Sequence, residues 1–155
     1  GSQAGLLRQI LSRDGLLEGQ VQAGHPSVLL PGQAAYAALP RFYRSADLYI
    51  AATHSDGTSI SLLEAMACGC PALVSDIPGN REWITPGENG WLTPVGDADA
   101  LAQAILNAVD QRAGLPQMGR AACRLAEQRA DWNQNFPRLF EAYRIARGAG
   151  LKRRK

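Results

Sequence analysis

The chain has 155 residues, of which 46% are hydrophobic and 19% are charged, and its formal net charge is +2. This length and balance are typical of one soluble globular domain with a hydrophobic core, and they exclude a disordered chain. No apolar run reaches the length of a membrane span, and no basic face interleaved with aromatic residues predicts binding of nucleic acid.

Apolar segments alternate with turn signals along the chain, and their periodicity separates helices from strands. In chain order, the sequence predicts a helix over residues 5–15, a strand over 28–30, a helix over 39–45, a strand over 47–52, a loop over 53–57, a helix over 59–68, a strand over 71–75, a loop over 84–90, a strand over 91–95, and helices over 97–113, 115–130 and 133–147. Strands that alternate with helices predict a parallel α/β sheet.

Several side chains are expected to face the core. The continuous apolar run 47–52 is typical of a strand covered on both faces. Gly69 is a natural stop for the helix before it. The stripe of helix 97–113 predicts four inward residues, Leu101, Ile105, Leu106 and Val109. The three tryptophans are interpreted as core or helix-packing anchors rather than sugar platforms: Trp83, Trp91 and Trp132.

The expected fold is α/β and Rossmann-like, with a parallel sheet and helices on both faces. A doubly wound sheet usually has roughly five or six strands, and this sequence offers about four. It opens on a helix, so we expect the first strands of the domain to be missing. Residues 1–2 are interpreted as a scar of tag removal, 3–150 as a partial Rossmann-like domain and 151–155 as a basic tail.

Residues 49–69 carry the pattern that points to chemistry. An apolar strand ends at a polar loop that holds Asp56 and then Gly57, and the chain turns directly into a helix that begins near Ser59. The first amides of a helix have no internal partner and carry partial positive charge. At the carboxyl end of a parallel strand, such a helix start is suited to an anion, and phosphate is the obvious candidate.

A second carboxylate, Glu64, follows Leu62 and Leu63 inside the same helix. A charged residue on a largely apolar helix needs a partner, either a ligand hydroxyl or a protein donor. A ribose diol would serve, because a carboxylate can accept two hydrogen bonds. The order carboxylate, amide cradle, carboxylate matches the sugar hydroxyls, the diphosphate and the ribose of a nucleotide sugar.

The pattern Asp56-x7-Glu64, with LLEAMACGCP at its end, resembles the Glu-x7-Glu motif of the family-4 retaining glycosyltransferases, which have the GT-B fold. The flanks LPRFYRSADLYIAA, PALVSDIPGNREWI and GENGWLTPVGDADALAQAI also resemble that family. The resemblance extends from about residue 6 to residue 147. It implies that the chain is the C-terminal, donor-binding domain of such an enzyme, truncated at its N-terminal side.

The resemblance implies a role for each matched residue. Asp56 contacts hydroxyls of the donor sugar and Glu64 holds the ribose, and these two are the candidate catalytic residues. Backbone amides approach the donor, near the sugar at Gly57, Thr58 and Ser59 and near the diphosphate at Ile60 and Ser61. The donor would be a UDP- or GDP-linked sugar, transferred with retention and without a metal or other cofactor.

The sequence departs from the family pattern in two places. Asp56 stands where the family has Glu, which shortens its reach by about 1.5 Å. Thr58-Ser59 replaces the common Phe-Gly. The basic pair that clamps the diphosphate would lie upstream, and the acceptor (a sugar, lipid or glycan) would be held by the missing N-terminal domain. We therefore expect partial donor binding and little transfer by this chain alone. The helices over 115–147 are expected to expose apolar surface towards that domain.

Most candidates also have a structural explanation. Asp56 could cap the helix or form an Asx-turn, and Glu64 could be a buried carboxylate satisfied by protein donors. Asp97 and Asp99 could be read as a metal-binding pair, but helix capping and dipole pairing explain them better.

Two further polar residues are candidates to line the site. His54 lies beside the motif loop, with an ordinary surface position as the alternative, and Arg81 follows strand 71–75 at the expected ligand edge.

Two rival functions stay open at this stage, a nucleotide-sugar epimerase and a non-catalytic scaffold with the same fold. The three cysteines form no disulfide or zinc pattern and are interpreted as small buried thiols, which predicts a cytoplasmic protein. The basic residues 152–155 predict either a solvated end or a peripheral contact with anionic lipid at the membrane surface.

Overall fold

The computed structural model describes residues 9, 11–13, 28 and 32–152. It divides the chain into two compact units, Gly1–Tyr36 and Ala37–Lys155. In the first unit, residues 9 and 11–13 are helical, as predicted, and residue 28 forms a β-bridge. The rest of the predicted helix 5–15 and strand 28–30 lies outside the described residues.

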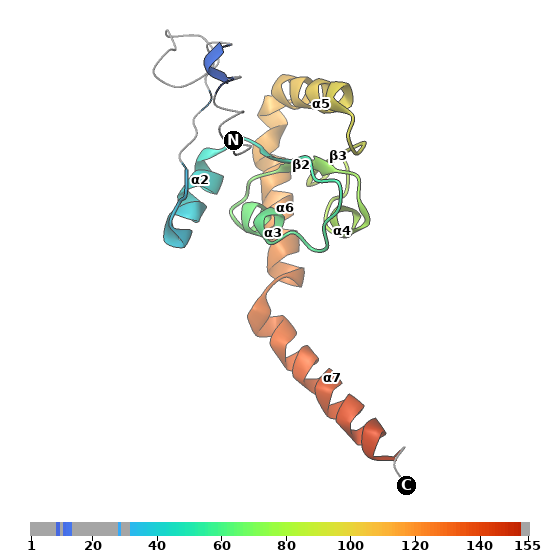
Figure 1. The fold of residues 1–155 in the computed structure, drawn as a ribbon. Helices are drawn as coiled ribbons and strands as arrows, with labels where there is room; N and C mark the ends of the chain where they lie inside the picture. The colour runs from blue at the N-terminus through green and yellow to red at the C-terminus, as the bar shows by residue number, and fades with distance from the viewer. Residues whose placement is uncertain (1–8, 10, 14–27, 29–31, 153–155) are drawn as a thin grey trace. The chain divides into compact units, whose positions relative to one another are not determined.

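From residue 36 onwards, helices and strands follow one another nearly as the sequence predicts (Figure 1). The order is η1 (Tyr36–Ala38), α2 (Leu39–Ser45), β1 (Tyr49–Ala51), α3 (Ile60–Ala67), β2 (Ala72–Ser75), α4 (Pro78–Arg81), β3 (Gly90–Thr93), α5 (Ala98–Asp110), η2 (Arg112–Gly114), α6 (Leu115–Arg129) and α7 (Trp132–Lys152). Helix α2 has the predicted bounds. The short helices η1, α4 and η2 were not predicted.

The strands form a parallel sheet in the order β1-β2-β3, in which Ala72 of β2 pairs with Tyr49 on one side and Gly90 on the other. The central strand β2 is buried on both faces: Ala72 and Val74 point to one face and Leu73 to the other. Burial of both faces is typical of parallel sheets. The predicted α/β, Rossmann-like class is confirmed.

Strand β1 is shorter and less buried than predicted. The apolar run 47–52 yields a strand only at Tyr49–Ala51, and Ile50 is 43% exposed. Ile50 points away from the face that carries Tyr49 and Ala51, and the described elements leave it uncovered there. An apolar run does not by itself distinguish an edge strand from a central one, and β1 lies at the edge of the described sheet.

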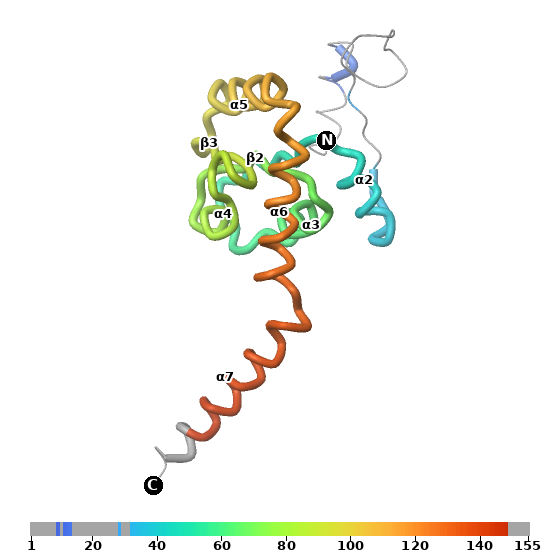
Figure 2. Tube along the Cα trace, turned by 180° about the vertical axis from the view of Figure 1, so that it is seen from behind, coloured from blue at the N-terminus to red at the C-terminus, as the bar shows by residue number. Residues whose placement is uncertain are grey.

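The core lies between the sheet and two helices that pack side by side, α3 and α6 (Figures 1 and 2). Leu62 and Met66 of α3 meet Ala122 and Ala126 of α6 over the β2 side chains. Trp83 is 8% exposed and belongs to this core, which confirms its predicted role. The Arg129 guanidinium lies over the Trp83 ring at 4.7 Å from its centroid, a cation–π contact.

Helix α3 stops just before Gly69, and Gly69 terminates it as predicted. Gly69 has φ +76°, a left-handed conformation that favours glycine. The Gly69 amide bonds the Met66 carbonyl at 2.9 Å, and the Cys70 amide bonds the Ala65 carbonyl at 3.0 Å, the two bonds of a Schellman cap. Gly119 of α6 packs directly against this turn, where an added Cβ would overlap the Gly69 carbonyl oxygen. The two glycines let α3 and α6 approach closely.

Helix α5 packs through a narrower stripe than predicted. Leu101 and Ile105 are half-buried and Ala108 is 2% exposed, and the spacing of these three residues places them on one face of the helix. Leu106 and Val109 are 58% and 61% exposed, so their predicted inward position is wrong. They lie beside the contact stripe, where the described structure provides no cover.

Helix α7 exposes a row of large apolar side chains, as expected for the last helices: Trp132, Phe136, Leu139, Phe140, Tyr143 and Ile145. Trp132 is 63% exposed, and among the described residues its ring contact is with Phe136 of its own helix, with ring centroids 5.5 Å apart. The prediction that Trp132 is a core or helix-packing anchor is therefore wrong. Trp91 is half-buried on β3. No helix among the described residues is long and apolar enough to cross a membrane.

The cysteines are free thiols with different surroundings. Cys70 is buried, and burial raises the pKa of its thiol to about 11. Cys68 and Cys123 are only half-buried. The interpretation as small buried thiols is thus confirmed for Cys70 alone.

Candidate functional site

The carboxyl ends of the three parallel strands meet at one edge of the sheet, and the loops that follow them contact one another there. An added Cβ at Gly79, at the start of α4, would stand 2.8 Å from the Gly57 carbonyl carbon and 3.1 Å from the Asp56 carbonyl oxygen. An added Cβ at Gly96, after β3, would stand 3.6 Å from Nε2 of His54. The motif loop, residues 52–59, therefore lies against both the turn that follows β2 and the loop that follows β3.

The amino end of α3 opens at this edge. Ser59 is its N-cap, with φ −71° and ψ 115°, and its Oγ accepts the Leu62 amide at 3.4 Å. The Ser59 hydroxyl lies 3.1 Å from Oγ of Ser61, which lies 2.8 Å from the Tyr49 hydroxyl. No acidic residue lies in the first turn, so no side chain there offsets the positive end of the helix dipole.

Asp56 is exposed on the loop before this helix. Because Ser59 is the cap, the alternative that Asp56 caps α3 is wrong. Within residues 32–152, the Asp56 carboxylate has no hydrogen-bond or ion-pair partner. It is a free acceptor beside a helix start, which is suited to hydroxyl groups of a ligand.

Glu64 lies one turn further along α3 and is half-buried. Its Oε2 accepts a hydrogen bond of 3.1 Å from the Tyr43 hydroxyl of α2. Burial, together with this bond and the negative charge of Glu64, raises the pKa of Tyr43 to about 12, so the phenol remains a donor. One oxygen of Glu64 is thus satisfied by protein, and the described residues provide no partner for Oε1. The sequence analysis missed Tyr43, whose bond spans 21 positions.

Arg81 is bound by a carboxylate that the sequence analysis did not consider. Its guanidinium donates to Asp76 through Nε at 2.6 Å and Nη2 at 3.0 Å. The bond from Arg81 holds the pKa of Asp76 below its usual range. Both side chains are exposed, so the pair contributes little to stability. Arg81, a predicted candidate to line the site, lies near the carboxyl edge of the sheet, but its guanidinium is already bound to Asp76.

The turn after β2 was also missed, although Pro78-Gly79-Asn80 is a visible turn signal. Asn80 is 2% exposed, and its Nδ2 donates to the Ser75 carbonyl at 2.8 Å. This bond fixes the start of α4 on the end of β2. The fixed turn holds Gly79 against the motif loop.

Asp97 is a helix cap, as predicted: its Oδ1 accepts the Ala100 amide at 2.8 Å, and Asp99 lies in the first turn of α5. Within the described residues, no group of three or more His, Cys, Asp or Glu side chains is arranged to hold a metal ion.

This arrangement, a parallel sheet with a helix start and two carboxylates at its carboxyl edge, defines a Rossmann-like domain with a candidate ligand site at that edge. Residues 10–111 match the family described as glycosyl transferases group 1. The chain belongs to this family, which favours a transferase over the epimerase alternative.

Named relatives agree with the family. A phosphatidyl-myo-inositol mannosyltransferase of Mycolicibacterium smegmatis is 37% identical over 135 residues, which cover 84% of this chain and 33% of the relative. A GDP-mannose-dependent alpha-mannosyltransferase of Mycobacterium tuberculosis is 27% identical over 146 residues, 94% of this chain and 38% of the relative. The chain thus spans about a third of the length of these relatives.

Solved structures share the fold. Sucrose-phosphate synthase from Thermosynechococcus elongatus superposes with a TM-score of 0.81 at 23% identity, covering 96% of this chain and 35% of that one. HepE of Anabaena, in complex with UDP-glucose, gives a TM-score of 0.73 at 23% identity, covering 92% and 36%.

Proposed function

We propose that this chain is the donor-binding part of a retaining family-4 glycosyltransferase, and that the carboxyl edge of its sheet holds a nucleotide sugar. The observation that carries the proposal is the environment of the Glu64 carboxylate. Its carboxylate is half-buried, has one oxygen fixed by Tyr43 and leaves the other without a partner among the described residues. A fixed carboxylate with a free acceptor, one turn inside a helix that opens at the ligand edge, fits a ribose diol.

The remaining roles follow from the order of groups along the motif. The amides of Ile60 and Ser61 at the uncompensated start of α3 would face the diphosphate. The amides of Gly57, Thr58 and Ser59, with the free Asp56 carboxylate, would face the sugar. His54, beside Gly96, would border the same edge. In this proposal, Asp56 and Glu64 touch the donor directly.

Fixed amide dipoles would also supply the electrostatic stabilisation of the departing nucleoside diphosphate. The donor is therefore expected to react without a bound metal ion. The transfer would proceed with retention, as in the family that the motif resembles. Because the side chains of Ser59 and Ser61 bond each other and Tyr49, the amide groups of this turn are held in place before the ligand arrives.

The donor nucleotide would be UDP or GDP. GDP-mannose is the first donor to test, because relatives are named as mannosyltransferases and one of them as GDP-mannose-dependent. UDP-glucose is the second, because HepE holds it on the same fold. A lipid acceptor is supported by the name of the phosphatidyl-myo-inositol mannosyltransferases, and it would bring the whole protein to a membrane surface.

Ligand-observed NMR with UDP, GDP, GDP-mannose and UDP-glucose tests the proposal. We expect one of the two nucleotides, with its sugar conjugate, to bind, and this binding to be lost in Glu64→Ala. Glu127→Ala is the matched control, because Glu127 is an exposed residue of α6 and, within the described residues, its carboxylate contacts the Cys123 thiol at 3.8 Å and no residue of the loop or helix start at 56–61. Binding of a nucleotide that Glu64→Ala leaves unchanged would contradict the site. Absence of binding by every nucleotide would leave two explanations, an indispensable upstream diphosphate clamp or a non-catalytic scaffold, and the same titration of the full-length protein would separate them.

A further inference from the structure

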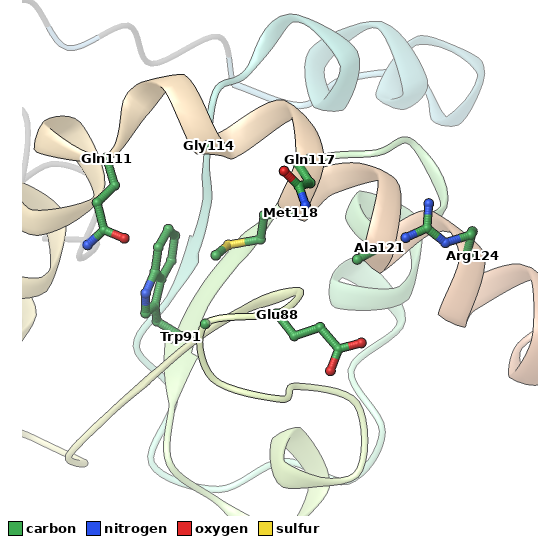
Figure 3. A pocket seen from close by; sticks show the side chains of 9 residues that line it. Glu88, Trp91, Gln111, Gly114, Gln117, Met118, Ala121 and Arg124 are labelled. Atoms are coloured by element: carbon green, nitrogen blue, oxygen red, sulfur yellow. The ribbon is translucent and has the colours of Figure 1, made fainter.

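A separate pocket lies on the other side of the domain, between α6, the end of α5 and the turn before β3 (Figure 3). Its volume of about 460 Å³ falls within the range of small-molecule sites, about 300–1,000 Å³. Glu88 precedes β3 and Gln111 follows α5, so the pocket lies at the amino edge of the sheet. The candidate donor site lies at the opposite, carboxyl edge.

The pocket has an aromatic wall and an apolar floor. Trp91 of β3 is half-buried and presents its indole to the pocket, at the same end as Gln111 in the view of Figure 3. Met118 of α6 is 8% exposed and lies under the pocket. Trp91 therefore lines a cavity, whereas the tryptophan that fills the core is Trp83. An exposed indole face can hold the apolar face of a ring.

Four polar side chains line the same pocket: Glu88, Gln111, Gln117 and Arg124. Within the described residues, none of them makes a side-chain hydrogen bond or an ion pair. Two amides, one carboxylate and one guanidinium offer donors and acceptors together. This mixture suits hydroxyl groups, each of which both donates and accepts. One negative and one positive side chain leave the pocket without net charge, which disfavours a strongly charged ligand.

We infer that this pocket binds a neutral hexopyranose unit of a glycan, independently of the nucleotide-sugar site. The C–H groups on one face of the sugar ring would lie on the Trp91 indole, whose face carries partial negative charge. The ring hydroxyls would meet the amides of Gln111 and Gln117 and the charged groups of Glu88 and Arg124. Pyranose rings combine an apolar face with a hydroxyl rim, and the pocket combines the same two features.

The test is a protein-observed NMR titration of the 155-residue chain with methyl α-mannopyranoside and with maltose. Mannitol is the control ligand, because it carries hydroxyls without a ring face. We expect the indole signal of Trp91 to shift with the saccharides and not with mannitol, while those of Trp83 and Trp132 stay in place. The indole signal that is lost in Trp91→Phe identifies the signal of Trp91.

Exposed positions on α6 give variants that keep the fold. Gln117→Ala and Arg124→Ala remove pocket side chains, and Gln128→Ala and Arg120→Ala are matched controls on the same helix that do not line the pocket. We expect each pocket variant to weaken saccharide binding about two- to tenfold, the range of one net hydrogen bond. The controls and Glu64→Ala should bind as the parent chain does.

Three results would overturn the inference: no shift with either saccharide, equal shifts with mannitol, or equal losses in the pocket variants and their controls. The proposed donor site is unaffected by these outcomes, because it is measured with nucleotides and at Glu64.

Discussion

The contact between Gly79 and the motif loop gives a sharp test of how the candidate site is built. In Gly79→Ala, the new Cβ would overlap the Gly57 carbonyl oxygen and stand 2.8 Å from its carbon. Non-bonded carbons pack at about 3.5–4.0 Å, so the carbonyl carbon must move by about 1 Å. Asn80 fixes α4 on the end of β2, whereas Gly57 is exposed, so the motif loop is the part that yields.

The energetic cost should therefore appear in binding more than in stability. A loop that is free to move limits the loss of unfolding free energy to about 1 kcal/mol, the low end of overpacking costs. Displacing site groups by 1 Å can cost about a hundredfold in their function, so we expect nucleotide-sugar binding to weaken about ten- to a hundredfold. The amides of Gly57 and Thr58 lie in the displaced stretch.

The assay pairs an NMR titration of the nucleotide with a thermal melt of the same sample. Gly148→Ala is the control, since Gly148 lies in α7 with no atom near an added Cβ. Parent-like nucleotide binding in Gly79→Ala, with an unchanged melt, would refute the reasoning. It would mean that α4 does not position the motif loop.

Three further predictions concern packing and charge. Gly119→Ala should lower the unfolding free energy by about 1–3 kcal/mol in urea denaturation, because its Cβ would overlap the Gly69 carbonyl group, whereas Gly114→Ala, whose added Cβ would meet no atom, should be near neutral. Arg81→Gln should raise the pKa of Asp76 in a carboxyl NMR titration. In the parent chain, the lowered pKa of Asp76 gives a small stabilisation, which is present above the pKa of the unfolded chain and is lost as the pH falls through the pKa of the folded chain. An Asp76 pKa that does not change in Arg81→Gln would contradict the ion pair between Asp76 and Arg81. Cys70 should be the last thiol that an alkylating reagent modifies at neutral pH, because burial raises its pKa to about 11; early modification, located by mass spectrometry, would contradict its burial.

The sequence predicts the local elements of this domain well, since helix and strand periods and the Gly69 stop are local signals. The burial of a side chain depends on its tertiary neighbours, and the periodicity of apolar residues does not identify them. Leu106, Val109 and Ile50 are apolar, yet the described structure leaves each of them exposed. Trp83 and Trp132 have the same side chain, and only the packing of α3 and α6 against the sheet makes one of them core.

For the candidate site, the sequence identifies the acidic residues and the helix start, because these lie within one short motif. It does not identify their supports. Tyr43 reaches Glu64 from a different helix, and Asp76 binds Arg81 after a different strand. Gly79 meets Gly57 only because parallel strands bring their carboxyl ends together. These are tertiary contacts between separate elements, and a single sequence carries no local signal for them.

The most direct test of the central claim is a map of backbone amide shifts when the chain is saturated with GDP-mannose or UDP-glucose. The account predicts that the largest shifts fall on residues 57–61 and on Glu64, at the carboxyl edge of the sheet. It also predicts that Glu64→Gln, which keeps the size of the side chain, removes them. Shifts confined to the pocket at Trp91, or to the exposed face of α7, would contradict the assignment of the donor site.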